Sequence, residues 1–496
     1  MINDIDTALP TESAETKYRI GTLEYTKRGL FLLFVYLLWG DFCFTIMESV
    51  FPQITPITMR NLGSSNFLIS MVITTIPSIF NAVVCPWVSF KSDRHRSKSG
   101  RRIPFLLFPT PFVSLFLILI GLSPDIGKFL SHTVLHTTHW STTAIVLTLI
   151  AVFSAGFQYF NMFVGSVYYY LFNDVVPEEL LGRFMSAFRL VGTVAGAVFN
   201  YFVFRYAESH MKWIFIGCGL LYFIAFTQMS LKVKEGEYPD PPEYVDGNKG
   251  VFSGLKSYFE ECFSHKFYWY FILSTAAWEL TYCISPFNVF LQQKSLGLSL
   301  FQIGKILSVA GIVTAVFVFP AGWISDKHHP LRTTLFAGIG LVVLAPTRLI
   351  YLFHNFDPPT AYKLEFALQM ILVPLGTIYM VSNLPMYMRV LPSERYGQFC
   401  SAQAMFRSVC VIIFGMLAGG FMDLMKKICA GYHMPPFYYY KFVPTWTWAL
   451  QIISVLLTWR LYKYWKEYGG DESFVAPAVG RVTEVDAEPE VQPSIM

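Results

Sequence analysis

The chain has 496 residues, of which 54% are hydrophobic and 14% are charged, and its formal net charge is +4. A soluble domain cannot bury so large an apolar fraction, so the composition excludes an ordinary soluble protein and indicates one whose solvent is the lipid bilayer. The net charge is too small to suggest a nucleic-acid partner, and we expect none.

The apolar residues come in blocks of about 20, which is the length of helix that crosses roughly 30 Å of hydrocarbon. Such blocks predict an all-α polytopic membrane protein. We place twelve transmembrane helices near residues 29–51, 66–90, 103–123, 143–171, 184–204, 213–230, 267–291, 301–324, 333–353, 364–389, 400–424 and 444–463.

Lysine and arginine are concentrated in alternate loops. They gather near residues 17–28, in the loop 91–102 and in the stretch 231–266, whereas the first two loops on the other side hold only Arg60 and Lys128. The positive-inside rule therefore places both termini in the cytoplasm. The first apolar block is too long for the hydrophobic region of a signal peptide, so we expect it to remain as a helix of a multi-pass protein in the cell membrane.

A polar stretch rich in charge, Pro and Gly separates the sixth predicted helix from the seventh. The motif PxxxxGxFxS begins at Pro177 and recurs 215 residues later at Pro392, which indicates parallel repeats. We therefore divide the chain into a cytoplasmic N-terminal segment, a six-helix bundle, a cytoplasmic central loop, a second six-helix bundle and a disordered cytoplasmic tail: residues 1–28, 29–230, 231–266, 267–466 and 467–496.

The loop 92–105 reads SDRHRSKSGRRIPF. Together with the twelve-helix organisation, this loop resembles the major facilitator superfamily, and particularly its glycoside-pentoside-hexuronide:cation symporter branch and the related sucrose:proton symporters. The resemblance implies a secondary active transporter in which two parallel six-helix repeats rock around a midplane substrate site. It also implies a small-molecule substrate, a coupling cation and no cofactor, and we expect a monomer.

A carboxylate followed by clustered Arg and Lys in a short loop can form charge-assisted hydrogen bonds in one transporter state and break them in another. The positive-inside rule alone explains the cations, but it explains neither the carboxylate nor the glycine of this loop. The candidate gate residues are Asp93, Arg94, Gly100, Arg101 and Asp326, the last of which lies in a weaker second copy of the motif.

Five charged residues qualify as charges in the interior of predicted helices, away from their ends: Asp41, Glu48, Arg189, Glu279 and Arg407. Each costs roughly 2.5 to 3.5 kcal/mol at a helix centre, so we expect these residues to pair or to face a water-filled cavity. Asp41 and Glu48 are seven residues apart, which puts them on one stripe of a helix and suggests one pathway. Arg189 is close enough to a cytoplasmic loop to reach the interface instead.

The symporter branch resembles this chain in two functional positions. It places a sugar-binding carboxylate on helix one, which Asp41 matches, and an arginine that opens an R-x-x-x-[ST]-x-A-G pattern on helix five, which Arg189 matches. A cation is also usual on helix eleven, where Arg407 lies close to it. With polar and aromatic neighbours added, the candidate substrate-binding residues are Asp41, Gln158, Asn161, Arg189, Trp278 and Arg407.

Cation-binding members of the branch carry two carboxylates one turn apart on helix two, where this chain has Asn81 and Cys85. Sodium strongly prefers hard anionic oxygens, so these neutral side chains argue against sodium coupling. A buried carboxylate can instead bind a proton and release it when an arginine or water approaches. We therefore favour a proton over sodium, and the candidate coupling residues are Asp41, Glu48, Glu279 and Asn81.

Other functions stay open at this point. A transporter of organic anions, amphipathic compounds or lysolipids would use the same fold, and Arg189 and Arg407 would suit an organic anion. A nutrient receptor that no longer transports is a further alternative. We expect no enzymatic activity, because the chain contains no GxxxxGK[ST], HExxH or GxSxG motif.

Overall fold

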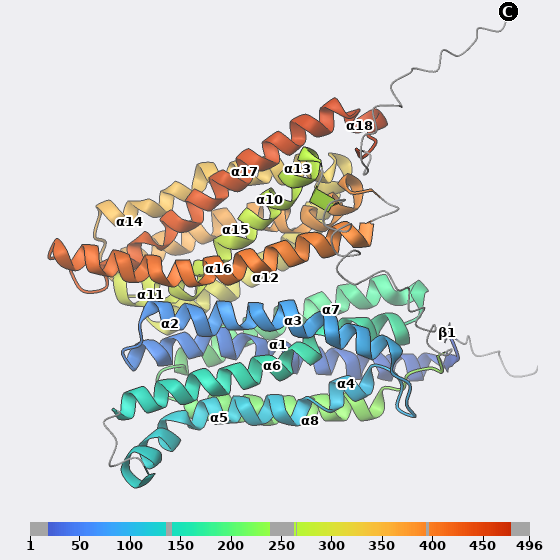
Figure 1. Ribbon diagram of the computed structural model, residues 1–496, viewed down its shortest axis with the longest axis horizontal. Coiled ribbons are helices and arrows are strands. Elements are labelled where there is room, and N and C mark those ends of the chain that lie inside the picture. The colour runs from blue at the N-terminus through green and yellow to red at the C-terminus, as the bar shows by residue number, and fades with distance from the viewer. Residues whose placement is uncertain (1–17, 135–140, 239–261, 264, 393–395, 478–496) are drawn as a thin grey trace, which may run out of the picture. The chain divides into compact units, whose positions relative to one another are not determined.

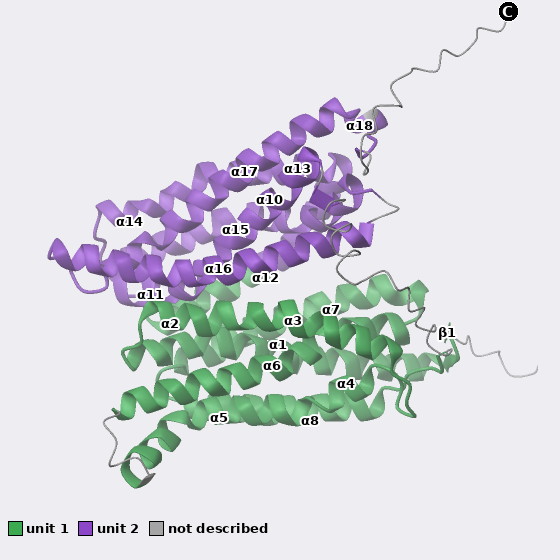
Figure 2. Ribbon diagram, in the orientation of Figure 1, with its two compact units in different colours: residues 1–243, 299–312 green, residues 244–298, 313–496 purple. Residues whose placement is uncertain are grey.

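Helices account for nearly all of the residues that the computed structural model describes, which are 18–134, 141–238, 262–263, 265–392 and 396–477 (Figure 1). The chain divides into two compact units, which are coloured separately in Figure 2. Unit 1 consists of residues 1–243 and 299–312, and unit 2 consists of residues 244–298 and 313–496.

Unit 1 begins with a small antiparallel hairpin, in which Arg19 is opposite Glu24. Its strands and α-helices are β1 (Tyr18–Ile20), β2 (Leu23–Tyr25), α1 (Lys27–Asn61), α2 (Asn66–Ser70), α3 (Ile76–Arg94), α4 (Ile103–Leu107), α5 (Thr110–Phe129), α6 (Thr142–Val175), α7 (Glu178–Val198) and α8 (Met211–Lys232). Other helical turns join or extend these helices: Met71–Thr75, Leu130–Val134, Phe199–Val203 and Phe204–Tyr206.

Side-chain caps mark where several helices of unit 1 begin. The Thr26 Oγ1 atom accepts a hydrogen bond from the Gly29 N–H at 3.1 Å at the start of α1. In the same way, the Ser141 Oγ atom accepts from the Ala144 N–H at 3.2 Å at the start of α6. These caps satisfy N–H groups that have no partner within the first helical turn.

Unit 2 contains α10 (Lys266–Leu280), α11 (Asn288–Phe290), most of α12 (Leu300–Lys327), α13 (Pro330–Leu344), α14 (Ile350–Phe353), α15 (Pro358–Val390), α16 (Tyr396–Gly431), α17 (Val443–Glu467) and α18 (Gly470–Ser473). The 3₁₀ turns Ala345–Leu349 and Tyr438–Phe442 precede α14 and α17. The beginning of α12, up to Ile312, is grouped with unit 1.

The predicted helix 267–291 is interrupted. After α10 the chain forms a 3₁₀ segment (Thr281–Phe287), the single turn of α11 and a π-helical turn (Leu291–Ser295). Pro286 lies inside the 3₁₀ segment, where it lacks the N–H that a continuous α-helix needs. The apolar pattern therefore predicted the position of this span but not its change from α-helix to 3₁₀- and π-helix.

Eleven helices within the described residues are long and apolar enough to cross a membrane. They match eleven of the predicted blocks, and the remaining block is the interrupted segment that starts with α10. The prediction of an all-α polytopic membrane protein is confirmed. The observed helices are longer than the apolar blocks, and α6 in particular continues past residue 171 to Val175.

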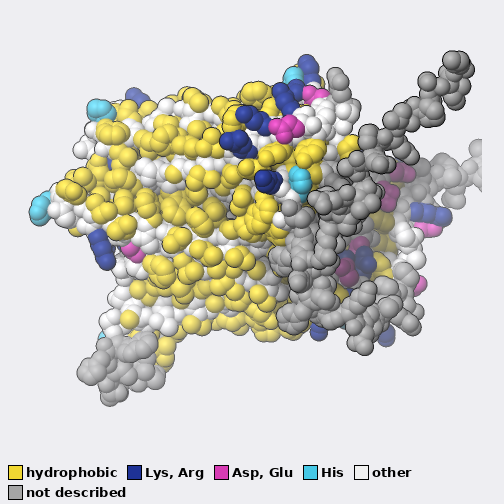
Figure 3. Space-filling view, turned by 45° about the horizontal axis from the view of Figure 1, so that its top comes forward, with side chains coloured by type: hydrophobic (Ala, Val, Ile, Leu, Met, Phe, Trp, Pro, Cys, Tyr) yellow, Lys and Arg dark blue, Asp and Glu magenta, His cyan; other side chains and the backbone are white. Residues whose placement is uncertain are grey.

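Large hydrophobic side chains point outward from helices of unit 2, where Phe319 is 74% exposed and Val343 is 68% exposed. On the face drawn in Figure 3, hydrophobic side chains cover the broad middle and charged side chains gather towards the ends. An exposed apolar surface of this extent suits contact with lipid rather than with water.

The repeated PxxxxGxFxS motif lies at the start of α7 in unit 1 and of α16 in unit 2. In both places its phenylalanine is buried in aromatic packing. Phe184 lies 5.0 Å from Phe172 between ring centroids, and Phe399 lies 4.3 Å from Tyr268. Core packing therefore explains why this position is the same in both halves.

Part of the predicted disordered tail is ordered in the structure. α18 follows α17, Asp471 forms an ion pair with Arg332 at 2.5 Å, and the Tyr268 hydroxyl donates to the carbonyl oxygen of Pro477 at 2.7 Å. These contacts hold the chain against unit 2 beyond residue 467. The rest of the tail, most of the N-terminal segment and much of the central loop lie outside the described residues, at 478–496, 1–17, 239–261 and 264.

Gly121 on α5 faces α8 at close range. A Cβ atom added there would lie 2.7 Å from the Phe215 Cβ and 3.1 Å from the Lys212 carbonyl oxygen. We expect Gly121→Ala to destabilise the protein by about 1–3 kcal/mol, because the two helices must move apart. Gly217→Ala is the matched control, since nothing lies within 4 Å of its added Cβ and alanine favours the helix. Equal melting temperatures of the two variants in detergent would contradict this account.

Candidate functional site

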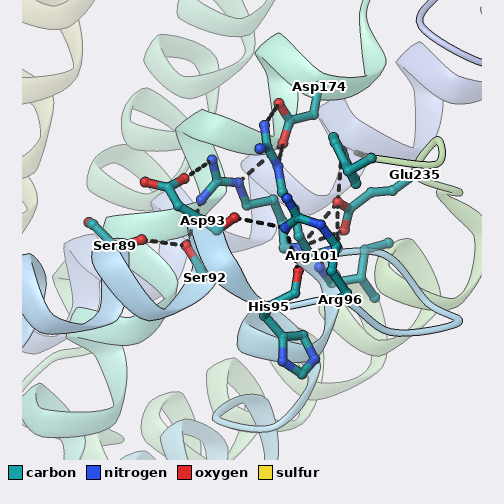
Figure 4. Close-up of polar contacts among 11 residues, drawn as sticks. Ser89, Ser92, Asp93, His95, Arg96, Arg101, Asp174 and Glu235 are labelled. Carbon is teal, nitrogen blue, oxygen red and sulfur yellow. Dashed lines mark hydrogen bonds and ion pairs between the residues drawn. The ribbon is translucent and has the colours of Figure 1, made fainter. Parts of the chain in front are cut away.

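Charged side chains gather at one end of unit 1, around the loop that joins α3 to α4 (Figure 4). Arg101 and Arg102 from this loop meet Asp174 near the end of α6, Asp93 at the end of α3 and Glu235 just after α8. We call these five residues the loop cluster. It ties together segments of unit 1 that are far apart in the sequence.

Asp174 is shared by both arginines of the loop cluster. The Arg101 Nε and Nη2 atoms donate to its two carboxylate oxygens at 2.9 and 2.6 Å, and the Arg102 Nε donates at 3.1 Å. Arg102 is 5% exposed and also contacts Ser92 Oγ and Asp93 Oδ1, each at 2.5 Å. Because bidentate charge-assisted bonds fix both distance and direction, they hold the ends of α3 and α6 against the start of α4. The hydrogen bond to Asp174 also raises the pKa of Arg101.

The carboxylate of Glu235 caps the start of α4. It accepts hydrogen bonds from the backbone N–H groups of Arg101, Arg102 and Ile103 at 3.0, 2.8 and 2.6 Å. Gly100 makes this approach possible, because its φ is +98° and an added Cβ would lie 2.5 Å from the Glu235 Cδ. Glycine is therefore required here both for the turn and for the space.

The start of the central loop is held on both sides. The Tyr238 hydroxyl donates to Glu235 at 3.0 Å, and the Arg101 guanidinium lies over the Tyr238 ring at 4.1 Å. Burial and the neighbouring Glu235 raise the pKa of Tyr238, which keeps its hydroxyl a donor. Thr22, in the turn of the N-terminal hairpin, accepts from the Glu237 N–H at 2.8 Å. The hairpin, the α3–α4 loop and the start of the central loop thus lie at the same end of unit 1.

Three of the predicted gate residues, Asp93, Gly100 and Arg101, take part in this arrangement. Arg94 lies over the Phe90 ring at 3.8 Å. Sequence patterns did not reveal Asp174, because the predicted helix ends at residue 171, or Glu235, because it lies in a loop. Carboxylates at the ends of helices on the same side as an Arg-Arg pair would have been the available signal. The gating role of all these residues stays a prediction.

The second copy of the loop motif is built differently. Asp326 at the end of α12 is exposed, and the Ser325 Oγ atom is buried without a hydrogen-bond partner among the described residues. His329 occupies the connection to α13 with a φ of +61°, and its Nδ1 atom caps the first turn of that helix. Burial, together with Arg389, lowers the pKa of His329 to about 4, so the ring is neutral at neutral pH.

Asp41 of α1 is buried, with 2% of its surface exposed. Its side chain hydrogen-bonds to Thr45, whereas its Oδ2 atom has no hydrogen-bond partner among the described residues. A Cβ added at Gly192 of α7 would lie 3.5 Å from this Oδ2 atom. The glycine therefore leaves room for the carboxylate between the two helices.

Glu48, two turns after Asp41, accepts a hydrogen bond from the Asn161 Nδ2 atom of α6 at 2.5 Å. Gln158 is buried one turn before Asn161 on the same helix. The structure thus brings together one residue predicted to couple the cation and another predicted to bind substrate. A neutral amide, rather than a cation, holds this carboxylate.

Arg189 is exposed on α7. Tyr169 of α6 interacts electrostatically with Arg189, Asp41 and Glu48, which are the three charges predicted inside unit 1. On α3, Asn81 is exposed, and the Cys85 sulfur lies 3.8 Å from the Met162 sulfur. Cys85 therefore packs as a small apolar side chain.

Glu279 of α10 and Arg407 of α16 also lie near each other. The Arg407 Nη1 atom is 3.9 Å from the Glu279 Oε1 atom, and the two side chains are 36% and 34% exposed. The Arg407 Nε atom is buried without a hydrogen-bond partner among the described residues. These residues form a loose, partly exposed ion pair inside unit 2.

Trp278, a candidate substrate-binding residue, is buried and has one face of its ring covered. Its ring stacks on Tyr379 with 3.5 Å between centroids and 16° between planes. Tyr282, one turn later, is 57% exposed. An approaching ligand would therefore meet Tyr282 more readily than the face of Trp278.

A second intramembrane ion pair was not predicted. The Arg348 Nη2 atom donates to Glu365 at 2.9 Å, and Glu365 also accepts from Gln292 at 3.0 Å and from Tyr351 at 3.1 Å. Arg348 in addition bonds to Gln369. Both charged residues fall near the ends of their predicted helices. A charge costs less there than at the centre, so the sequence did not single them out.

We expect Asp174→Asn to destabilise unit 1 by about 1–3 kcal/mol, because two arginines lose their shared anion. Asp125→Asn is the matched control: Asp125 bonds to Lys212 at 2.6 Å, but both side chains are exposed, so its loss should cost about 1 kcal/mol or less. Thermal unfolding of both variants in detergent measures the difference. Equal losses would show that the loop cluster adds no more than a surface pair.

The lowered pKa of His329 makes the stability of unit 2 depend on pH. Below about 6.5 the unfolded chain binds a proton that the folded ring binds only near 4, so stability falls as the pH drops through this window. We expect His329→Asn to reduce this fall, since asparagine also caps helices and tolerates a positive φ. The exposed neighbour His328→Asn is the control and should leave the pH dependence of the melting temperature unchanged.

The sequence matches two family profiles. Residues 38–289 match the family described as MFS/sugar transport protein, and residues 199–415 match the Major Facilitator Superfamily. The first match covers 252 of the 496 residues, which is just over half of the chain.

Curated relatives match over a shorter stretch. Sucrose transport protein SUC3 of Arabidopsis thaliana is 36% identical over 85 residues, which are 17% of this chain and 14% of that protein. Sucrose transport protein SUT5 of Oryza sativa subsp. indica is 33% identical over 93 residues, or 18% of this chain and 17% of that protein. The aligned stretch thus spans less than a fifth of either relative.

Solved structures match over nearly the whole chain. A bacterial homolog of the human lysosomal transporter Spinster, in an inward-facing and unoccupied conformation, has a TM-score of 0.67 at 14% identity and covers 89% of this chain and 99% of its own. A D-xylose-proton symporter has a TM-score of 0.57 at 10% identity, and the match covers 86% of this chain and 96% of that protein. At such low identity these likenesses show the fold alone. The family match over more than half of the chain establishes that the chain belongs to the major facilitator superfamily and is a multi-pass membrane transporter rather than an enzyme.

Proposed function

We propose that the protein is a proton-coupled symporter of a sugar, glycoside or uronic acid that works by alternating access. The observation that carries this proposal is the state of three carboxylates inside membrane-spanning helices. Asp41 has a buried oxygen without a hydrogen-bond partner among the described residues, Glu48 is held by a neutral amide, and Glu279 lies 3.9 Å from Arg407.

A carboxylate in hydrocarbon must be neutralised or hydrated, because an isolated buried charge is very costly. A bound proton would neutralise Asp41 or Glu48, whose hydrogen-bond partners among the described residues, Thr45 and Asn161, carry no charge. Glu279 differs, since Arg407 can compete with the proton for the same carboxylate. Movement of the arginine towards or away from Glu279 would then release or admit a proton, which is the event that a symporter must couple to substrate movement.

The neutral side chains Asn81 and Cys85 support a proton over sodium, because they offer no anionic oxygen to a metal ion. Two findings support a sugar as the substrate. One is the sugar-transport description of the family matched by residues 38–289, and the other is the local similarity to plant sucrose transport proteins. In our proposal Asp41, Gln158, Asn161 and Arg189 bind substrate hydroxyl groups in unit 1. Trp278 and Arg407 are the proposed substrate-binding residues of unit 2.

The loop cluster end of unit 1 is proposed to face the cytoplasm. Its arginines and lysines lie on the side that the positive-inside rule assigns to the cytoplasm, and the N-terminal hairpin lies at the same end. We place the protein in the cell membrane, with the loop cluster and Asp326 as parts of the cytoplasmic gate.

Uptake into proteoliposomes tests the proposal. The purified protein is reconstituted, an inside-alkaline pH gradient is imposed, and the accumulation of labelled sucrose, glucose, a glucoside and glucuronate is measured. We expect gradient-driven accumulation of at least one of these compounds. For Glu279→Gln we expect accumulation to fall at least tenfold while exchange at equal pH persists, because the amide resembles a carboxyl group that is always protonated.

Glu208→Gln is the matched control, since Glu208 lies in a loop of unit 1, where it bonds to Asn61 at 3.3 Å. Its uptake should equal that of the wild type. A complete lack of gradient-dependent uptake of every sugar would defeat the proposed function. Unchanged accumulation by Glu279→Gln would instead remove the role assigned to that residue.

A further inference from the structure

Unit 2 contains a cavity of about 370 Å³ that is separate from the Glu279–Arg407 pair. Residues of α10, the following 3₁₀ segment, α13, α15 and α17 line it. Its volume lies at the lower end of the roughly 300–1,000 Å³ that is usual for small-molecule sites. The cavity therefore has room for one ring rather than for an extended oligosaccharide.

Gln451 of α17 provides an unused acceptor in this cavity. The residue is 8% exposed, and its Oε1 atom is buried without a hydrogen-bond partner among the described residues. Buried side-chain oxygens are nearly always paired in folded proteins, so an unpaired one that lines a cavity marks a place where a ligand can donate. A ligand hydroxyl group can supply this donor.

Arg348, which also lines the cavity, provides an unused hydrogen-bond donor. Its Nε atom is buried and has no hydrogen-bond partner among the described residues, so it can donate to a ligand oxygen. Its positive charge is already balanced by Glu365 at 2.9 Å, which is itself held by Gln292 and Tyr351. Arg348 is the only charged residue described in the lining, so the cavity favours a neutral ligand over an anion.

Further hydroxyl and amide groups complete the lining, among them Thr281, Asn288 and Gln369. Tyr282 adds an aromatic ring that is 57% exposed. Alternating donors and acceptors beside an aromatic ring match a molecule that has hydroxyl groups around its edge and C–H groups on its face. Glu279, which follows Trp278 directly, is not among the residues described in the lining.

We propose that this cavity binds one neutral polyhydroxylated ring, with Gln451 accepting from one hydroxyl group and Arg348 donating to another. The identification of that ring as a sugar rests on the proposed function. The site would give unit 2 a place for one sugar ring that is distinct from its loose ion pair.

Equilibrium binding of glucose, sucrose and glucuronate to the full-length protein in detergent tests this inference. Tryptophan fluorescence is a suitable readout because Trp278 forms part of the wall. We expect glucose to bind, and Gln451→Leu to weaken its binding about three- to tenfold, as for the loss of one hydrogen bond between neutral groups. Gln369→Leu lies on a different helix and is a second variant with the same expected direction, so the test does not depend on the folding of one protein.

Gln228→Leu on α8 is the matched control: it is the same substitution at an exposed position of unit 1, and it should leave glucose binding unchanged. Unchanged affinity in both Gln451→Leu and Gln369→Leu would overturn the inference, as would tighter binding of glucuronate than of glucose or no sugar binding at all. Glucose binding that both variants weaken, without any gradient-driven uptake, would support the site and defeat the proposed symport. Gradient-driven uptake by the wild type, together with unchanged glucose affinity in both variants, would support the proposed symport and defeat the proposed site.

Discussion

The constraint on which this structure depends is the cost of placing a charge in hydrocarbon. An ionised side chain within the bilayer must be paired, hydrated or neutralised by a proton. The fold concentrates its most connected charge network at the ends of the spans, where Arg101 and Arg102 share Asp174. There the network can join helix ends through bidentate bonds without opposing the lipid. Inside the spans the described charges do not join in one such network, and their environments differ.

Unit 2 shows two degrees of pairing. Glu365 is 1% exposed, and it is bound by Arg348 and by two uncharged donors, so its charge is fully compensated. Glu279 has one arginine at 3.9 Å, and both partners are about one-third exposed. A tightly compensated pair resists change, whereas a loose one can be broken and remade at low cost. The first therefore suits a structural role, and the second suits a site that changes its charge during transport.

The helices were predictable because bilayer thickness sets their length, and α2 together with α3 begins and ends close to the predicted span 66–90. The break at Pro286 was not predictable from hydropathy, since an apolar 3₁₀ turn has the same composition as an apolar α-helix. It was harder still to predict which charged residues pair with each other. Arg101 lies 73 residues from Asp174 and 134 from Glu235, so these contacts exist only through tertiary packing. Glu48 and Asn161 were both named from the sequence, but their direct contact across 113 residues was not.

The two halves share a fold and a repeated motif, yet their chemistry is unequal. Glu48 in unit 1 accepts a hydrogen bond from the amide of Asn161, whereas Glu279 in unit 2 lies 3.9 Å from the guanidinium group of Arg407. In our proposal Arg407 competes with the proton for Glu279, whereas Asn161, being neutral, does not compete in this way at Glu48. A carboxylate whose proton can be displaced by a moving arginine is the better coupling element, and this difference places the coupling step in unit 2 in our proposal.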